Sequence, residues 1–169
     1  MPEIPLIKLE SPEINYLKVG MVWRTNQNSS TAVKRSCKLM DFQYLLNIAG
    51  VSFYSLQKEP GVDLQLLKTL PILDLSSQLN DFADTAGIIT QLDLVITVDT
   101  AVVHLAGTLG KPVWILLPFV PNWRWMLDRN DSPWYPTARL FRQPKVGDWD
   151  SILIEVKQAL MEFIESQNN

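Results

Sequence analysis

Residues 94–112 read Leu94-Val95-Ile96-Thr97-Val98-Asp99-Thr100-Ala101-Val102-Val103-His104-Leu105-Ala106-Gly107-Thr108-Leu109-Gly110-Lys111-Pro112. An apolar, β-branched run ends at an Asp-Thr pair, and a helical pattern follows at once. Gly110 and Pro112 are typical residues to end that helix. A strand that turns directly into a helix is typical of open α/β sheets, which bind ligands beyond the carboxyl ends of their strands. The free N–H groups at the start of such a helix suit a phosphate.

The composition indicates one globular domain. The chain has 169 residues, of which 47% are hydrophobic and 20% charged, enough for a sizeable core. The formal net charge of −3 and the pI of about 5.1 argue against nucleic acid as a main partner, because phosphate backbones attract basic proteins. A small nucleotide needs only a local cluster of donors and is compatible with this charge.

Cellular location is inferred from the cysteine and the apolar runs. A single cysteine, Cys37, permits no internal disulfide and favours the cytoplasm. No apolar run approaches the roughly 18 residues of a transmembrane helix. We expect residues 1–17, which contain three prolines, to form an extended lead-in or linker, and residues 18–166 to form the domain.

Apolar runs alternate with helical patterns along the chain. The expected strands are 19–23, 51–57, 71–75, 94–98, 112–117 and 138–142, and the expected helices are 41–49, 63–68, 81–92, 101–109 and one through 152–164. A polar loop is expected at 24–38. This alternation predicts an α/β fold, a Rossmann-like doubly wound parallel sheet of about six strands.

The strongest candidate site is the Asp99-Thr100 turn with His104. Asp99 could accept a hydrogen bond from a ribose or sugar hydroxyl, or it could brace the turn. Thr100 could cap the helix through its hydroxyl. His104 is the only histidine; it is either a packed residue or a donor to a diphosphate oxygen.

Two other turns supply further candidates. Arg24 follows the first expected strand, and its guanidinium carries a fork of donors suited to phosphate. Lys34 and Arg35 in the same loop are either further anion contacts or solvated side chains. Gln57 and Lys58 end the second expected strand, where Gln57 could contact a base or ribose.

Residues 118–136 form an unusual loop with three of the six tryptophans and four prolines. Rigid aromatic side chains beside a sheet edge suit stacking on a base or a sugar; alternatively, the indoles fasten the loop to the domain. Asp148 and Asp150 precede the last expected helix and are interpreted as capping residues rather than a metal site. No metal site is expected, because the chain has one histidine and one cysteine.

Together these motifs resemble the nucleotide-sugar-binding lobe of a two-lobed (GT-B) glycosyltransferase. The similarity is to family 9 heptosyltransferase-like proteins and to bacterial glycosyltransferases fused behind tetratricopeptide repeats. It covers residues 18–165 and rests on Lys18-Val19-Gly20-Met21-Val22-Trp23-Arg24, Ser55-Leu56-Gln57-Lys58, residues 81–86, residues 93–107, and the loop from Trp123-Arg124-Trp125 to Trp134-Tyr135-Pro136.

The resemblance implies that this lobe holds a nucleotide-diphosphate-sugar donor and moves the sugar to an acceptor hydroxyl, in a glycan, lipid or protein. It implies donor contacts from Arg24, Gln57, Lys58, Asp99, Thr100, Ala101 and His104, with no metal and no cofactor. It also implies an N-terminal lobe or repeat domain as partner, which would supply the catalytic base. The chain alone would then bind a donor but catalyse little.

Two departures from the family pattern keep alternatives open. Ala101 stands where heptosyltransferases commonly have glycine, and the loop after Arg24 lacks the glycine and histidine expected from the repeat-fused relatives. The alternatives are a sugar-nucleotide epimerase-like lobe and a non-catalytic lobe that acts as an interaction module.

Overall fold

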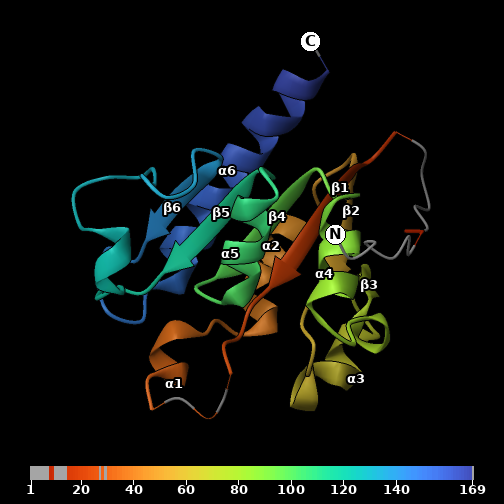
Figure 1. The fold of residues 1–169 in the computed structure, drawn as a ribbon, viewed down its shortest axis with the longest axis horizontal. Coiled ribbons are helices and arrows are strands. Elements are labelled where there is room, and N and C mark those ends of the chain that lie inside the picture. Colours follow the sequence, from red (N-terminus) through yellow and green to blue (C-terminus); the bar gives the residue numbers. More distant parts are fainter. Residues whose placement is uncertain (1–7, 10–14, 27, 29, 169) are drawn as a thin grey trace.

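The computed structural model describes residues 8–9, 15–26, 28 and 30–168, and shows one parallel sheet (Figure 1). Its strands lie in the order β3-β2-β1-β4-β5-β6, and every neighbouring pair is parallel. The bounds are β1 (Leu17–Val22), β2 (Val51–Ser55), β3 (Ile72–Asp74), β4 (Leu94–Val98), β5 (Val113–Leu117) and β6 (Ala138–Arg142). The predicted Rossmann-like sheet is confirmed.

Helices lie on both faces of this sheet. The α-helices are α1 (Ala32–Arg35), α2 (Gln43–Leu46), α3 (Leu64–Leu67), α4 (Phe82–Ile89), α5 (Ala101–Thr108) and α6 (Trp149–Gln167). Short 3₁₀ turns are η1 (Leu39–Phe42), η2 (Gly61–Asp63), η3 (Ser76–Gln78) and η4 (Trp123–Trp125). The last turns of α6 extend beyond the sheet (Figure 1).

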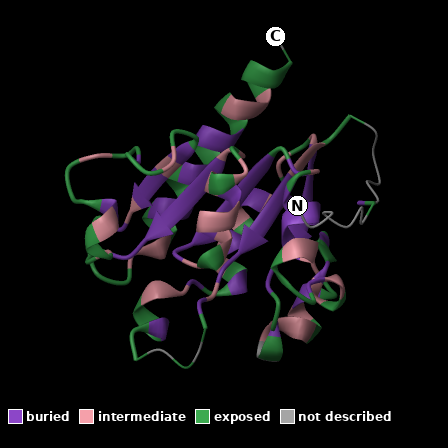
Figure 2. Cartoon of the chain, viewed as in Figure 1, coloured by how far each residue is buried: buried purple, intermediate pink, exposed green. Residues whose placement is uncertain are grey.

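The sheet separates two apolar cores, because successive side chains of a strand point to opposite faces. On β4, Ile96 packs with α6 residues such as Leu153, whereas Val95 packs with Ile88 of α4 and Val103 of α5. Buried residues fill the centre of the sheet in Figure 2. Strands β2, β4 and β5 are buried along their whole length, as strands covered on both faces must be.

Local signals in the sequence correctly placed several helix ends. Gly110 has φ +67°, and Lys111 N–H donates to the Ala106 carbonyl at 3.0 Å, which is the Schellman ending of a helix. Asp81 Oδ1 accepts from Asp84 N–H at 2.8 Å and begins α4. Asp148 Oδ1 accepts from Ser151 N–H at 3.1 Å, so the predicted capping role before α6 is confirmed.

Other expectations differ from the structure. The helix expected at 41–49 is split into η1 and α2, and the one expected at 63–68 into η2 and α3, because the extent of so short a helix depends more on tertiary packing than on helix propensity. The loop expected at 24–38 contains α1. Thr100 begins α5 but makes no side-chain capping bond; its hydroxyl lies 3.2 Å from that of Thr97.

The predicted lead-in falls mostly on residues 1–7 and 10–14, which lie outside the described residues. Leu9, within it, is buried at 6% exposure, and its N–H donates to Gln91 Oε1 at 3.0 Å. In the described part of the chain, every helix is too short or too polar to cross a membrane.

Candidate functional site

The order of the strands puts a topological switch point between β1 and β4, and we call the sheet edge at the carboxyl ends of these two strands the crevice. The chain leaves β1 toward β2 and β3 on one side, and continues from β4 toward β5 and β6 on the other. At such a switch point the two connections diverge, and open α/β sheets bind ligands there, outside the carboxyl ends of the strands. The segment after β1 and the Asp99-Thr100 turn after β4 therefore lie at this same edge of the sheet.

Arg35, at the end of α1, bridges the crevice to Asp99. Its Nη2 donates to the Asp99 carbonyl at 2.7 Å and lies 3.3 Å from Asp99 Oδ2. The Asp99 side chain is 5% exposed and that of Arg35 33%. A carboxylate this deeply buried needs a paired cation, and the arginine side chain that supplies it stays partly exposed.

The start of α5 leaves donors available in the same crevice. Ala101 is exposed and is the first residue of the helix. Within the residues that the structure describes, nothing accepts a hydrogen bond from the N–H groups of Ala101 and Val102, whereas Val103 N–H donates to the Thr100 carbonyl at 3.1 Å. Because the Thr100 hydroxyl does not cap the helix, both N–H groups and the positive end of the helix dipole face outward.

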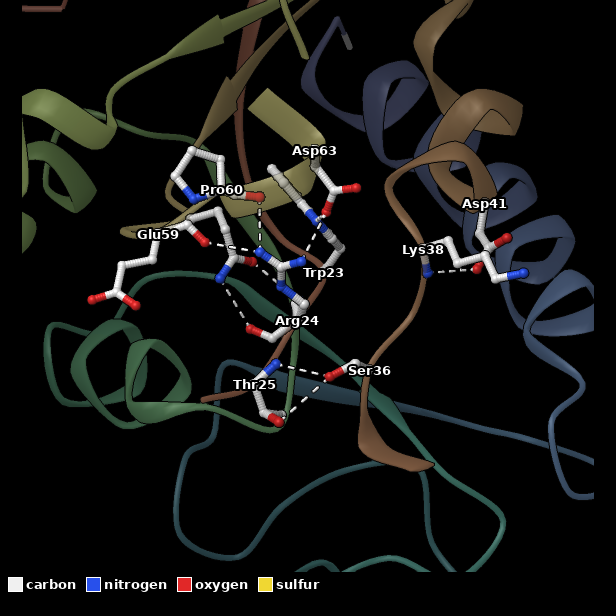
Figure 3. A network of polar contacts seen from close by, with 10 residues as sticks. Trp23, Arg24, Thr25, Ser36, Lys38, Asp41, Glu59, Pro60 and Asp63 are labelled. Atoms are coloured by element: carbon white, nitrogen blue, oxygen red, sulfur yellow. Dashed lines mark hydrogen bonds and ion pairs between the residues drawn. The ribbon is translucent and has the colours of Figure 1, made fainter. Parts of the chain in front are cut away.

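Arg24 points away from this turn, toward the segment after β2 (Figure 3). Its Nη2 donates to the carbonyls of Glu59 and Pro60 at 2.9 and 2.8 Å, and its Nη1 lies 3.3 Å from Asp63 Oδ2. The same oxygen accepts from Trp23 Nε1 at 2.8 Å. Arg24 thus joins β1 to η2, and its predicted contact with a diphosphate stays a prediction.

The other predicted residues on this side also make contacts within the protein. Gln57 is buried, and its Oε1 and Nε2 bond to the Arg24 N–H and carbonyl at 3.1 and 3.2 Å. Lys58 Nζ donates to the Asn80 carbonyl at 3.0 Å. Lys34 is exposed on α1. Gln57 therefore holds the backbone of the turn after β1, and the proposed base contact remains untested.

His104 lies one turn into α5, in a network with the loop after β5. Arg124 Nη1 lies 2.9 Å from His104 Nε2, and since a guanidinium only donates, Nε2 must accept. The neutral ring then carries its proton on Nδ1, which donates to Tyr135 Oη at 2.8 Å. The imidazole also stacks on the buried Trp125, with ring centroids 6.0 Å apart. Both histidine nitrogens are therefore engaged in positioning neighbouring side chains.

These side chains line a cavity that we call the aromatic pocket. It has a volume of about 280 Å³ and is lined by His104, Trp123, Arg124, Trp134 and Tyr135. Trp134 is held by a bond from its Nε1 to the Arg124 carbonyl at 3.1 Å. Tyr135 lies against Gly107 of α5, where a Cβ would overlap the ring. The pocket thus joins the helix of the Asp-Thr turn to the tryptophan-rich loop.

Sequence patterns indicated the two residues that organise the site only weakly. Arg35 was one of two adjacent basic residues, and nothing in their spacing distinguishes the one that reaches Asp99. Tyr135 was noted only as part of an aromatic loop. The glycine at 107, unfavourable within a helix, was the one available signal that a side chain packs against α5 there.

Across the residues described, no three or more His, Cys, Asp or Glu side chains gather in a way that would hold a metal ion. The prediction of a metal-independent site is left untested by this observation.

Comparisons with known proteins support the fold. No family model matches the chain. It is 27% identical over 161 residues to the protein FlbA of Caulobacter vibrioides, a match that covers 88% of this chain and 26% of FlbA. The fold is similar to the structure of E. coli ADP-heptose LPS heptosyltransferase II, with a TM-score of 0.59 and 13% sequence identity.

This structural similarity covers 89% of the chain and 48% of the heptosyltransferase. The chain therefore spans about a quarter of the length of FlbA and about half that of the heptosyltransferase. At this level of identity the similarity shows a shared fold: the chain has the α/β architecture found in roughly half of a heptosyltransferase chain.

Proposed function

We propose that the chain is the donor-binding lobe of a glycosyltransferase that uses a nucleotide-diphosphate sugar. The observation that carries the proposal is the crevice between β1 and β4, where Arg35, Asp99 and the first N–H groups of α5 converge. The fold shared with a heptosyltransferase supports it.

Each group in the crevice has a role in this proposal. The N–H groups of Ala101 and Val102 and the helix dipole would hold the diphosphate. Arg35, whose side chain is partly exposed, would donate to a phosphate oxygen, because arginine forms strong charge-assisted bonds to phosphate. Asp99, neutralised by Arg35, would accept from a sugar or ribose hydroxyl.

The chemistry would follow from this arrangement. The acceptor oxygen attacks the anomeric carbon, the bond from that carbon to the diphosphate oxygen breaks, and the acceptor proton passes to a base outside this lobe. The diphosphate then carries additional negative charge. Fixed donors and a helix N-terminus stabilise such charge without reorganisation. Arg35 and the start of α5 would therefore contribute more to the rate of transfer than to the affinity for the intact donor.

Thermal denaturation in the presence of UDP, ADP and GDP tests the proposal. A nucleotide that binds the folded chain raises its melting temperature, and the rise grows with the logarithm of the nucleotide concentration above the Kd. We expect a rise with one nucleotide, and Arg35→Gln should weaken that binding by about 10- to 100-fold, the range for one charged hydrogen bond. Lys157→Gln, which removes an exposed charge from α6, serves as the matched control.

The same titration separates the alternatives. No shift with any nucleotide would contradict donor binding and favour an interaction module. If a nucleotide binds, supplying its sugar conjugates to the full-length protein distinguishes transfer from epimerisation. Arg24→Gln and Thr100→Val test two of the other predicted contacts.

A further inference from the structure

The aromatic pocket contains a cation that the described protein does not neutralise. The Arg124 Nε donates to Asn122 Oδ1 at 3.1 Å and its Nη1 to His104 Nε2 at 2.9 Å. Both acceptors are neutral groups, and Arg124 takes part in no ion pair with a described carboxylate. By contrast, Arg24, Arg35 and Arg129 each lie beside an aspartate.

The network behind Arg124 is built to hold the guanidinium while leaving its charge available. His104 can accept from Arg124 only as a neutral ring protonated at Nδ1, and Tyr135 accepts that proton at 2.8 Å. A glutamate in place of His104 would orient the arginine equally well but cancel its charge. The arginine therefore lines the cavity with its charge unpaired by a described carboxylate.

The walls of the pocket are aromatic and open to solvent. Trp123 is 79% exposed and Trp134 56%, although the indole is among the side chains that gain most from burial. Indole faces pack on the C–H face of a sugar ring. A cavity of about 280 Å³ lies just below the usual range for drug-sized ligands, which suits one ring rather than a whole nucleotide.

The pocket lies close to the proposed diphosphate site. His104 follows Thr100 by four residues in the same helix, which corresponds to a rise of about 6 Å. A sugar joined to a diphosphate at the start of α5, or an acceptor sugar facing it, can reach this cavity. An anionic group on that sugar would meet the guanidinium of Arg124, a cation that forms strong charge-assisted bonds to a carboxylate.

We propose that the aromatic pocket binds the ring of a sugar that carries a carboxylate. The ring stacks on Trp123 or Trp134, and the carboxylate pairs with Arg124, which His104 and Tyr135 position. The inference rests on the proposed function in that the sugar belongs to the donor or the acceptor of the transfer. The acidic class of sugar follows from the unpaired guanidinium alone.

The test uses the whole chain and free sugars, without nucleotide. The indole N–H signals in ¹⁵N NMR spectra are followed during titration with glucuronate and N-acetylneuraminate, and with glucose and glucuronamide as neutral counterparts. We expect saturable shifts with an acidic sugar and at least about tenfold weaker binding of the neutral ones, as for a lost charged hydrogen bond. Arg124→Gln should remove this preference, and Arg124→Lys should retain part of it.

Arg129→Gln is the matched control, because Arg129 lies in the same loop but pairs with Asp131. Equal binding of glucuronate and glucose, unchanged affinity in a folded Arg124→Gln variant, or no saturable shift with either acidic sugar would overturn the proposal. Binding of UDP, ADP and GDP to Arg124→Gln is measured in parallel. A chain that binds acidic sugars but no nucleotide would contradict the proposed function and leave the pocket assignment standing.

A second arm identifies the source of the sugar. An Arg124-dependent preference for UDP-glucuronate over UDP-glucose assigns the ring to the donor. Binding of free glucuronate without that preference assigns it to the acceptor.

Discussion

Replacing Gly107 with alanine should disturb the aromatic pocket through Tyr135, whose ring packs against this glycine of α5. A Cβ at this position would overlap Cγ and Cδ1 of Tyr135 and lie 3.0 Å from its Cδ2. Normal carbon contacts are about 3.5–4.0 Å, so the tyrosine ring would have to retreat by about 1 Å. The Tyr135–His104 hydrogen bond of 2.8 Å cannot be kept through such a shift.

The expected effect on stability is the sum of three terms. Overpacking a well-filled site costs about 1–3 kcal/mol, and loss of the hydrogen bond about 1 kcal/mol. Replacing a helical glycine by alanine returns about 0.5–1 kcal/mol. We therefore expect Gly107→Ala to lower the free energy of unfolding by about 2 kcal/mol, although alanine is the better helix former.

Urea denaturation of a double-mutant cycle measures this effect. In a Tyr135→Ala background the ring is absent, so Gly107→Ala should stabilise the chain by about 0.5–1 kcal/mol. The change in the free energy of unfolding caused by Gly107→Ala is thus expected to reverse its sign when the tyrosine is removed. If Gly107→Ala stabilises both backgrounds equally, Tyr135 does not pack on α5 and the described pocket is wrong.

Three further predictions concern the rest of the fold. Burial and the neighbouring Asp41 raise the pKa of the Cys37 thiol, so thiol reagents should modify it only after unfolding. Because the thiol ionises at lower pH in the unfolded chain, the free energy of unfolding should fall as pH rises above about 8.5. The fall should be less steep in Cys37→Ala, and equal slopes in the two proteins would contradict the burial of the thiol. Arg24→Met should cost about 2–3 kcal/mol in urea melts, because Asp63 loses its cation and the carbonyls of Glu59 and Pro60 lose their donor. Asp81→Ala should lower the free energy of unfolding by about 1 kcal/mol, because it removes the N-cap of α4. An unchanged unfolding midpoint would contradict this capping role.

The sheet was predictable because its signals are local. Apolar runs, the Gly110 ending of α5 and the aspartate caps each depend on a few neighbouring residues, and the parallel order follows from the alternation of strands and helices. The same signals placed the Asp99-Thr100 turn at the edge of the sheet, where the structure has it.

The directions of long side chains were not predictable, because they depend on contacts distant in sequence. Arg24 and Arg35 flank the same loop, yet one reaches Asp63 and the other Asp99, 64 residues away. The role of His104 likewise depends on Tyr135, 31 residues later. Short segments such as 41–49 were misjudged because tertiary packing, more than helix propensity, determines where so short a helix ends.

The central claim is that a diphosphate binds at the start of α5 beside Arg35, and NMR titration of the ¹⁵N-labelled chain tests it most directly. With UDP, ADP and GDP added in turn, we predict that one nucleotide shifts the amide signals of Ala101 and Val102 and the Arg35 Nε–H signal most strongly, and that Arg35→Gln suppresses these shifts. Shifts concentrated elsewhere, or none with any nucleotide, would contradict the account.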